Sequence, residues 1–435
     1  MIRRRRKDPR YEHWRRRIFG LTWLSYVGLY LTRKAFPVVK NELKKPEVLG
    51  LTNAHLAWMD AANSAAYALG QFVWGPLGDR AGTRAVILVG MLGSVCAALF
   101  MGWTSSVVVL AVLLAFQGWF QASGWAPLSK NMSEFFSAEE RGSVMGFWCT
   151  NYAFGGFIGS AIAGAVAQAW GWRWAFFVPA ALLLGIWILF YLFQKDTPED
   201  AGLPPIEVYH GLAREPKHPG RHAKPGESWG VVREVLRNRM VWLLAGVYVL
   251  IKPTRYLVLF WSPVFIHEQL GTGTAASGIL GSVFEIAGPL GALAGGLLSD
   301  RVFGARRMPA SILALFLLGA FMMVFRHLPA TPLAVGSGLF LIGFLIYIPD
   351  SLVSGTAAID FGTKRGASTA SGLVNGCGSL GQIVGVSMPG WISKVTGNTA
   401  DIWGPIFTSL GVALLVAGVL LLPQWNRRPP ELKGA

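Results

Sequence analysis

The chain has 435 residues, of which 53% are hydrophobic and only 14% are charged. This composition excludes a soluble domain and indicates a protein embedded in a lipid bilayer. The formal net charge of +16 could suggest a nucleic-acid partner, but the basic residues gather in the N-terminus, alternate loops and the C-terminal tail. That distribution is typical of a membrane protein, so we expect the lipid bilayer and no nucleic acid as a partner.

Apolar stretches near or above the roughly 20 residues that cross the hydrocarbon layer recur along the whole chain. They predict an all-α membrane protein with twelve transmembrane helices. The expected spans lie near residues 16–38, 54–79, 84–103, 106–130, 140–169, 172–194, 238–267, 273–299, 307–326, 331–354, 365–393 and 402–423.

A strongly basic segment precedes the first span, with nine of the 39 Lys and Arg before residue 18. No small-residue cleavage site follows, so this span is expected to remain as a helix and not to be a signal peptide. Basic residues favour the cytoplasmic side, which predicts a multi-pass protein of the plasma (inner) membrane with both termini in the cytoplasm. Six basic residues are expected on the opposite side of the membrane: Lys40, Lys44, Lys45, Arg173, Arg326 and Lys394.

The first span also contains an arginine, and the seventh span repeats its setting. The pattern Tyr-Val-x4-Thr-Arg ends at Arg33 and again at Arg255, each 16 residues after Arg17 or Arg239. A membrane-embedded arginine is costly and rarely accidental. At about 1.5 Å per residue both lie roughly 24 Å from the headgroups, near the middle of the bilayer. Two guanidiniums facing one cavity suggest an anion carrier, with phosphate favoured by their planar donor fork.

Other features repeat between the two halves of the chain. Residues 75–80 (Gly-Pro-Leu-Gly-Asp-Arg) follow the second span, as residues 296–301 (Gly-Leu-Leu-Ser-Asp-Arg) follow the eighth, and an Arg-Gly pair at 141–142 recurs at 365–366. Parallel six-helix halves with a site at their interface describe the major facilitator fold. The Asp and Arg of each Gly-x-x-x-Asp-Arg sequence are expected to pair across helix ends as scaffold.

A polar, proline-rich stretch joins the halves. We expect an N-terminal six-helix half at 1–194, a cytoplasmic linker at 195–237 and a C-terminal half at 238–435. The linker prolines are Pro198, Pro204, Pro205, Pro216, Pro219 and Pro225.

Several residues of potential chemical interest have a simpler interpretation. Cys96, Cys149 and Cys377 fit no metal or disulfide spacing and are expected to be packing residues. The Gly-x-Gly-x-x-Gly at 376–381 lies in a span with no preceding strand, so helix packing explains it. Lys130 and Glu134 are expected to form a surface pair. The chain has no nucleotide-binding loop and no catalytic constellation, so we expect no cofactor, no metal and no enzyme activity.

Longer motifs resemble the organophosphate:phosphate antiporter family, which includes the bacterial glycerol-3-phosphate and hexose-phosphate transporters. The resemblance covers residues 26–36 of the first span, 196–207 of the linker, 255–263 of the seventh span, Pro-Asp-Ser at 349–351 and Lys-Arg-Gly at 364–366. It implies that Arg33 and Arg255 bind phosphate. It also implies that Tyr26, Tyr30 and Lys34 lie around that pocket.

Three positions depart from the family pattern. The glycerol-phosphate members have a second-span lysine where this chain has Gln71, four residues after Tyr67. They have a fifth-span histidine where this chain has Tyr152, and an eleventh-span tyrosine where it has Ser379. Lys252, one turn before Arg255, is a gained cation. These differences leave the phosphate clamp but make glycerol-3-phosphate itself uncertain as the cargo.

The function expected from this resemblance is exchange of an organic phosphate ester for inorganic phosphate by a monomer that works by alternating access. Glu285 and Asp350 are expected either to pair with the arginines as structure or to exchange with the substrate. Two other functions stay open. A phosphate-ester sensor would bind a cytoplasmic partner; a proton-coupled exporter is disfavoured by the two arginines and the scarcity of acids within the spans.

Overall fold

The computed structural model describes residues 8–43, 45–51, 53–210, 228–271, 274–362, 365–396 and 402–429. These residues are almost entirely helical and contain no strand, which confirms the predicted fold class. The first half of the chain forms α1 (Pro9–Leu43), α2 (Asn53–Ala81), α3 (Thr83–Trp103), α4 (Val107–Gln121), α5 (Trp125–Phe135), α6 (Arg141–Trp148), α7 (Thr150–Trp170) and α8 (Trp174–Phe193).

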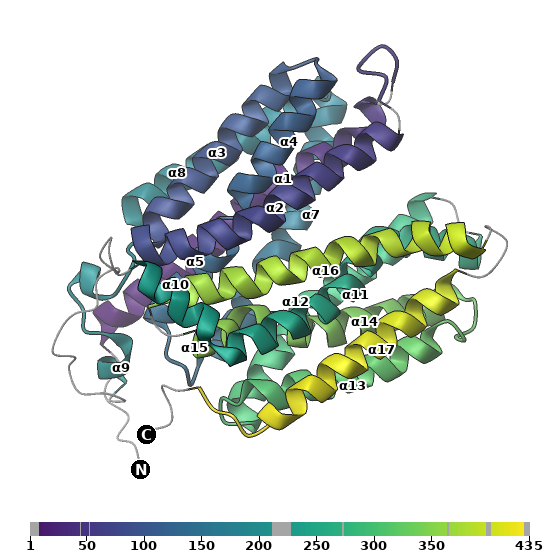
Figure 1. The fold of residues 1–435 in the computed structure, drawn as a ribbon. Coiled ribbons are helices and arrows are strands. Elements are labelled where there is room, and N and C mark those ends of the chain that lie inside the picture. Colours follow the sequence, from purple (N-terminus) through teal and green to yellow (C-terminus); the bar gives the residue numbers. More distant parts are fainter. Residues whose placement is uncertain are drawn as a thin grey trace.

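The second half of the chain repeats this arrangement after a connecting segment. The connection contains η1 (Glu199–Ala201), α9 (Ile206–Tyr209) and α10 (Ser228–Arg237). The second bundle comprises α11 (Arg239–Leu270), α12 (Thr274–Leu297), η2 (Leu298–Val302), α13 (Arg307–Phe325), α14 (Pro332–Ser351), η3 (Leu352–Ala357), α15 (Ala358–Phe361), α16 (Ala367–Thr396), α17 (Trp403–Leu421) and η4 (Leu422–Gln424). Figure 1 shows the two bundles as separate groups of long helices, with both termini at the same end.

Two of the predicted spans are each built from two helices. The stretch predicted at 106–130 is divided into α4 and α5 at residues 122–124, and the stretch predicted at 140–169 is divided into α6 and α7 at Cys149. At the first break a side chain of α1 lies against the chain, because a Cβ on Gly124 would lie 2.7 Å from Leu29 Cδ1. Glycine therefore leaves room for the Leu29 side chain, which would have to shift if a larger residue stood there.

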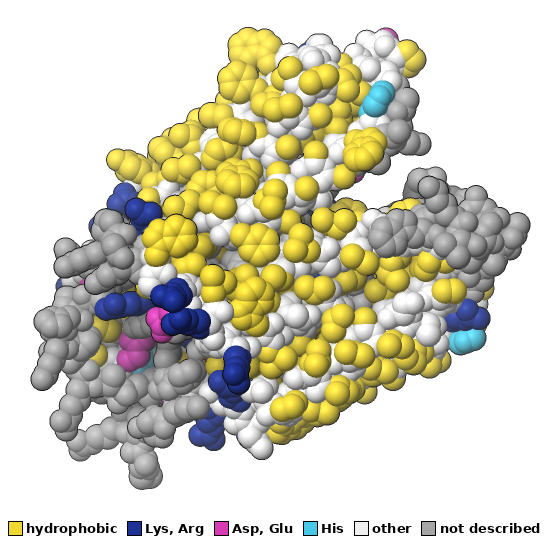
Figure 2. Space-filling view, in the orientation of Figure 1, with side chains coloured by type: hydrophobic (Ala, Val, Ile, Leu, Met, Phe, Trp, Pro, Cys, Tyr) yellow, Lys and Arg dark blue, Asp and Glu magenta, His cyan; other side chains and the backbone are white. Residues whose placement is uncertain are grey.

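Eight stretches among the described residues are long and apolar enough to cross a membrane by length and composition alone. The other four long helices are α1, α2, α12 and α16, of which α1, α2 and α16 are rich in polar residues. Three of them, α2, α12 and α16, pack against helices of the other bundle, where side chains are shielded from lipid. Figure 2 shows hydrophobic side chains spread over the surface of both bundles, which fits a multi-pass membrane protein.

The two bundles approach each other at the end that carries the termini, called here the terminal face, and separate at the opposite end. The space-filling view shows the hollow between them at that opposite end (Figure 2). Near the terminal face α2 packs against α16, and α6 packs against α12. Glycines allow this contact: a Cβ on Gly75 would lie 2.9 Å from Ser368 O and 3.2 Å from Gly372 Cα.

Polar bonds also join the bundles at the terminal face. Asp79 of α2 accepts hydrogen bonds from the backbone N–H groups of Ser368 (3.1 Å) and Thr369 (2.6 Å), at the start of α16. The carboxylate therefore stabilises the positive end of the α16 dipole. Lys130 completes the site, 2.9 Å from Asp79. The predicted surface role of Lys130 is wrong, because it is buried and pairs with Asp79 across helices.

A second network lies beside the first. Asp360 pairs with Arg307, at 2.8 Å, and with Arg141 of the other half. Asp300 pairs with Arg307 and accepts the backbone N–H of Ser143 at 2.6 Å. Each aspartate of the repeated Gly-x-x-x-Asp-Arg sequence thus pairs across helix ends as expected. Asp79 pairs with Lys130 and Asp300 pairs with Arg307, however, and in the described part of the chain neither pairs with the arginine that follows it in the sequence.

The first residues of the predicted linker pack beneath the N-terminal bundle. Tyr11 stacks on Tyr209 with ring centroids 3.9 Å apart, and its hydroxyl donates to Pro204 O at 3.1 Å. Burial of this ring raises the pKa of the Tyr11 phenol. Residues 195–210 are therefore attached to α1, whereas linker prolines Pro216, Pro219 and Pro225 lie outside the described residues.

The cysteines divide into three environments. Cys149 is buried, Cys377 is partly buried and Cys96 is exposed on the outer surface. The prediction that all three serve as packing residues is therefore wrong for Cys96.

Substitution of an interface glycine tests the contact between the halves. Gly296 of α12 meets the backbone of Gly142 and Ser143, so Gly296→Ala should cost roughly 1–3 kcal/mol because a backbone contact cannot rotate away. Gly246 of α11 has no neighbour within 4 Å, and Gly246→Ala is the matched control. Thermal unfolding in detergent should show a lower Tm for the first variant only; equal Tm values would contradict close packing at Gly296.

Candidate functional site

A cavity lies between the two bundles. Both halves of the chain contribute to its walls. Its lining side chains come from α1, α2, α5, α7, α11, α14 and α16. They are Tyr26, Tyr30, Arg33, Tyr67, Trp125, Tyr152, Tyr248, Lys252, Arg255, Tyr256, Asp350 and Asn375.

Arg33 is the cation that the N-terminal half contributes. Its Nε donates to Gln121 Oε1 at 2.7 Å, and the guanidinium lies over the rings of Tyr30 (4.5 Å) and Tyr67 (5.0 Å). Gln121 is itself held by Thr32, whose hydroxyl accepts from Gln121 Nε2 at 3.1 Å. Among the described residues no carboxylate pairs with Arg33, and one terminal nitrogen is buried without a partner. The positive charge is therefore uncompensated.

Arg255 is the corresponding cation of the C-terminal half. Its Nη1 donates to Asp350 Oδ2 at 2.7 Å, and Tyr248 donates its hydroxyl to the other Asp350 oxygen at 2.8 Å. The guanidinium also lies 4.5 Å from the Tyr347 ring centroid and 4.9 Å from that of Tyr152. Its Nε has no hydrogen-bond partner among the described residues. The two arginines thus differ, since one is paired with an acid and the other is held by neutral groups.

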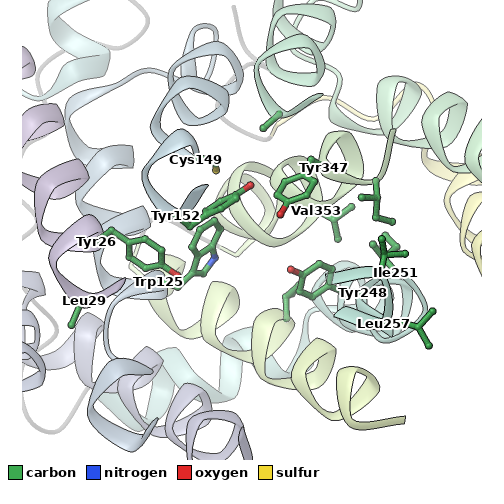
Figure 3. Packing of buried hydrophobic residues seen from close by; sticks show 14 of the residues in the cluster. Tyr26, Leu29, Trp125, Cys149, Tyr152, Tyr248, Ile251, Leu257, Tyr347 and Val353 are labelled. Carbon is green, nitrogen blue, oxygen red and sulfur yellow. The ribbon is translucent and has the colours of Figure 1, made fainter. Parts of the chain in front are cut away.

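Aromatic rings form much of the wall between the arginines. Figure 3 shows Tyr26, Trp125 and Tyr152 on the N-terminal side, opposite Tyr248 and Tyr347. Tyr152 and Tyr347 stack across the interface with centroids 5.5 Å apart. The Tyr152 hydroxyl is buried and forms no hydrogen bond within the part of the chain that the structure describes. These rings exclude water and present negative faces to the guanidiniums, which stabilises the cations.

Lys252 lies one turn before Arg255 and points toward α16. Its Nζ donates to Ser379 Oγ (2.7 Å), Asn375 Oδ1 (2.8 Å) and Asn375 O (3.3 Å). The cavity therefore contains three cationic side chains and one carboxylate.

This geometry can be compared with known proteins. Residues 18–385 match the family described as Major Facilitator Superfamily. The chain is 33% identical to the glycerol-3-phosphate transporter of Bacillus subtilis (strain 168), over 96% of this chain and 94% of that one. It is 31% identical to a probable hexose phosphate transport protein of Chlamydia pneumoniae, over 96% of this chain and 92% of that one.

The chain belongs to the organophosphate:phosphate antiporter family of the major facilitator superfamily. Another relative is the membrane sensor protein UhpC of Escherichia coli (strain K12), at 29% identity over 98% of this chain and 95% of that one. A solved structure of the proton:xylose symporter XylE shares the fold, with a TM-score of 0.75 at 13% identity and coverage of 98% of this chain and 99% of that one.

Four of the predicted site residues of this family member do not line the cavity. Lys34 follows Arg33 by one residue, about 100° around the helix, so it faces Gly156 and Gly159 of α7. Gln71 is fully buried on α2, and neither polar atom of its amide has a hydrogen-bond partner in the described ranges. Ser379 lies behind Lys252, and Glu285 is half-buried on α12.

The other eight predicted residues do line the cavity: Arg33, Arg255, Tyr26, Tyr30, Lys252, Tyr67, Tyr152 and Asp350. Sequence reasoning missed four lining residues, namely Trp125, Tyr248, Tyr256 and Asn375. For Tyr248 a signal was present, because it matches Tyr26 in the internal repeat. Asn375 precedes Ser379 by one helical turn, which places both on one face of α16.

Proposed function

We propose that this protein exchanges an organic phosphate ester for inorganic phosphate by alternating access. The observation that carries the proposal is the pair of arginines, Arg33 and Arg255, which come from different halves and line one cavity. The names of the relatives support an ester of the glycerol-3-phosphate or hexose-phosphate class. The phosphoryl group would bind between the two guanidiniums, whose planar forks match its oxygens.

The charges suggest how binding is coupled to movement. Arg33 has no carboxylate partner among the described residues, so an anion bound there gains a strong interaction. Arg255 is paired with Asp350, and a phosphoryl oxygen can replace that carboxylate. An anion held by both arginines draws the halves together and favours the closed state. Return is easiest with another phosphate bound, which makes the protein an exchanger.

The two bundles are the parts that would move during transport. The halves at residues 1–194 and 238–435 would rock about the site as a monomer, joined by the linker at 195–237. We place both termini in the cytoplasm and the protein in the plasma (inner) membrane, because the basic residues gather near the terminal face. The hollow between the bundles opens away from that face (Figure 2), so this conformation would accept substrate from outside.

Reconstituted protein should release labelled phosphate from loaded proteoliposomes only when a suitable anion is outside. The panel should include glycerol, triose, glycerate and hexose phosphates, with protein-free liposomes as the control. Stimulated efflux with at least one ester is the expected result. The proposal is contradicted if no compound stimulates efflux from vesicles that contain folded protein.

A sensor is the second candidate, favoured by the relative that is named a membrane sensor protein. A sensor would bind an ester without exchanging it. Equilibrium binding of the same panel to detergent-solubilised protein therefore separates the two functions: binding without stimulated efflux supports the sensor.

A further inference from the structure

Lys252 is buried, with 2% of its surface exposed, yet no carboxylate pairs with it among the described residues. Its ammonium has three protons and three oxygen acceptors, all on α16: Ser379 Oγ, Asn375 Oδ1 and Asn375 O. Each proton is thus already engaged by a neutral group. Lys252 holds α16 side chains in place and has no spare proton to offer a ligand.

The bonds from Lys252 fix the orientation of Asn375, which lines the cavity and is 5% exposed. An ammonium can only donate, so it fixes the Asn375 amide with the oxygen toward Lys252 and the NH2 group away from it. Within the described part of the chain, no hydrogen bond leaves this NH2 group. Asn375 therefore offers two oriented N–H donors to whatever occupies the cavity.

The charge of the cavity restricts the chemistry of that occupant. The cavity is lined by three cations and one anion, which leaves an excess of two positive charges. The cations are Arg33, Lys252 and Arg255, and the anion is Asp350. A phosphate monoester carries about −1.5 to −2 at neutral pH, which nearly neutralises this excess. A further carboxylate on the ligand would leave an uncompensated negative charge in a site shielded from water.

We propose that Asn375 is a specificity-determining residue for the organic part of the substrate and that Lys252 positions it. The Asn375 NH2 group donates to a hydroxyl or ether oxygen of a neutral polyol or sugar phosphate. Phosphorylated carboxylic acids are disfavoured. This inference rests on the proposed function, because it assigns the part of the substrate that the arginines do not hold.

The test measures how well external esters compete with inorganic phosphate in phosphate:phosphate exchange. Asn375→Ser keeps an oxygen that can accept from Lys252 but loses the amide donors. It should weaken competition by glycerol-3-phosphate or glucose-6-phosphate about tenfold, and the half-saturating phosphate concentration should change less than about twofold. In wild type, 3-phosphoglycerate should compete less well than the neutral esters. Ser387→Ala, about three turns along α16, is the matched control, since its hydroxyl only donates to Ile383 O.

Lys252 is tested as a positioning residue by rescue and by a double-mutant cycle. Lys252→Gln can still donate to Asn375 Oδ1 and should retain the ester ranking, whereas Lys252→Met should lose it. In an Asn375→Ser background, Lys252→Met should not lower the ester-to-phosphate ratio further.

The inference is overturned by an unchanged ester-to-phosphate ratio in Asn375→Ser, by a fully additive cycle, or by equal competition from 3-phosphoglycerate. In each of these cases phosphate exchange persists and the proposed function stands. Loss of all exchange in the wild type would instead contradict the proposed function. If Asn375→Ser fails to fold, the comparison of the two Lys252 variants still decides whether the amide orientation matters.

Discussion

Replacing Arg33 or Arg255 with lysine should lower phosphate exchange about tenfold or more, although the positive charge is kept. Lysine is a point charge on a flexible stem and cannot present two parallel N–H groups to a phosphoryl group. A tenfold loss corresponds to about 1.4 kcal/mol. At Arg33 the change also removes the Nε–H that bonds Gln121, so the new side chain is not held in the cavity.

The measurement is the initial rate of phosphate exchange in proteoliposomes with matched amounts of folded protein. Arg237→Lys is the control, because Arg237 is exposed on α10, away from the cavity. Near-normal exchange in either cavity variant would place that arginine in a structural role. For Arg255 the structural role would be its ion pair with Asp350.

The fold could be predicted because bilayer physics leaves few alternatives. Long apolar stretches in water-free surroundings must form helices, and the repeated sequences divide them into two halves. Arg33 and Arg255 could be singled out for the same reason, since an arginine within an apolar stretch is costly. The breaks near Cys149 and Gly124 could not be predicted, because the contact of Gly124 with Leu29 depends on how two distant helices pack.

The neutral parts of the site were harder to predict than the charged parts. Gln121 and Asn375 lie in apolar stretches where an amide has no distinctive pattern, and only the fold brings them to Arg33 and Lys252. Lys130 gave a misleading signal: its spacing from Glu134 fits a surface pair, but its partner Asp79 is distant in sequence. Spacing along one helix identifies neighbours on that helix and says nothing about a partner on another.

Asp360→Asn should strongly destabilise the conformation that is closed at the terminal face. Asp360 is shared by Arg141 and Arg307, which are 1% and 0% exposed. Removing one partner of a buried ion pair typically costs about 3–5 kcal/mol, since it leaves a buried charge uncompensated. Here two buried arginines lose the same carboxylate, and Arg307 keeps its second acid, Asp300. We expect a lower Tm and a population shift toward a state that is open at the terminal face.

Thermal unfolding in detergent measures the first effect, and maleimide labelling of a cysteine at Ser137 measures the second. Ser137 is buried near the terminal face, so labelling requires that this face opens; the native cysteines would first be replaced. Asp60→Asn is the matched control, because the Asp60 side chain is 50% exposed and its pair with Lys40 should contribute little. Unchanged Tm and labelling in Asp360→Asn would show that other contacts, such as the glycine interfaces, hold the face closed. Faster labelling at an unchanged Tm would mean that Asp360 controls the balance between the two conformations more than it controls folding.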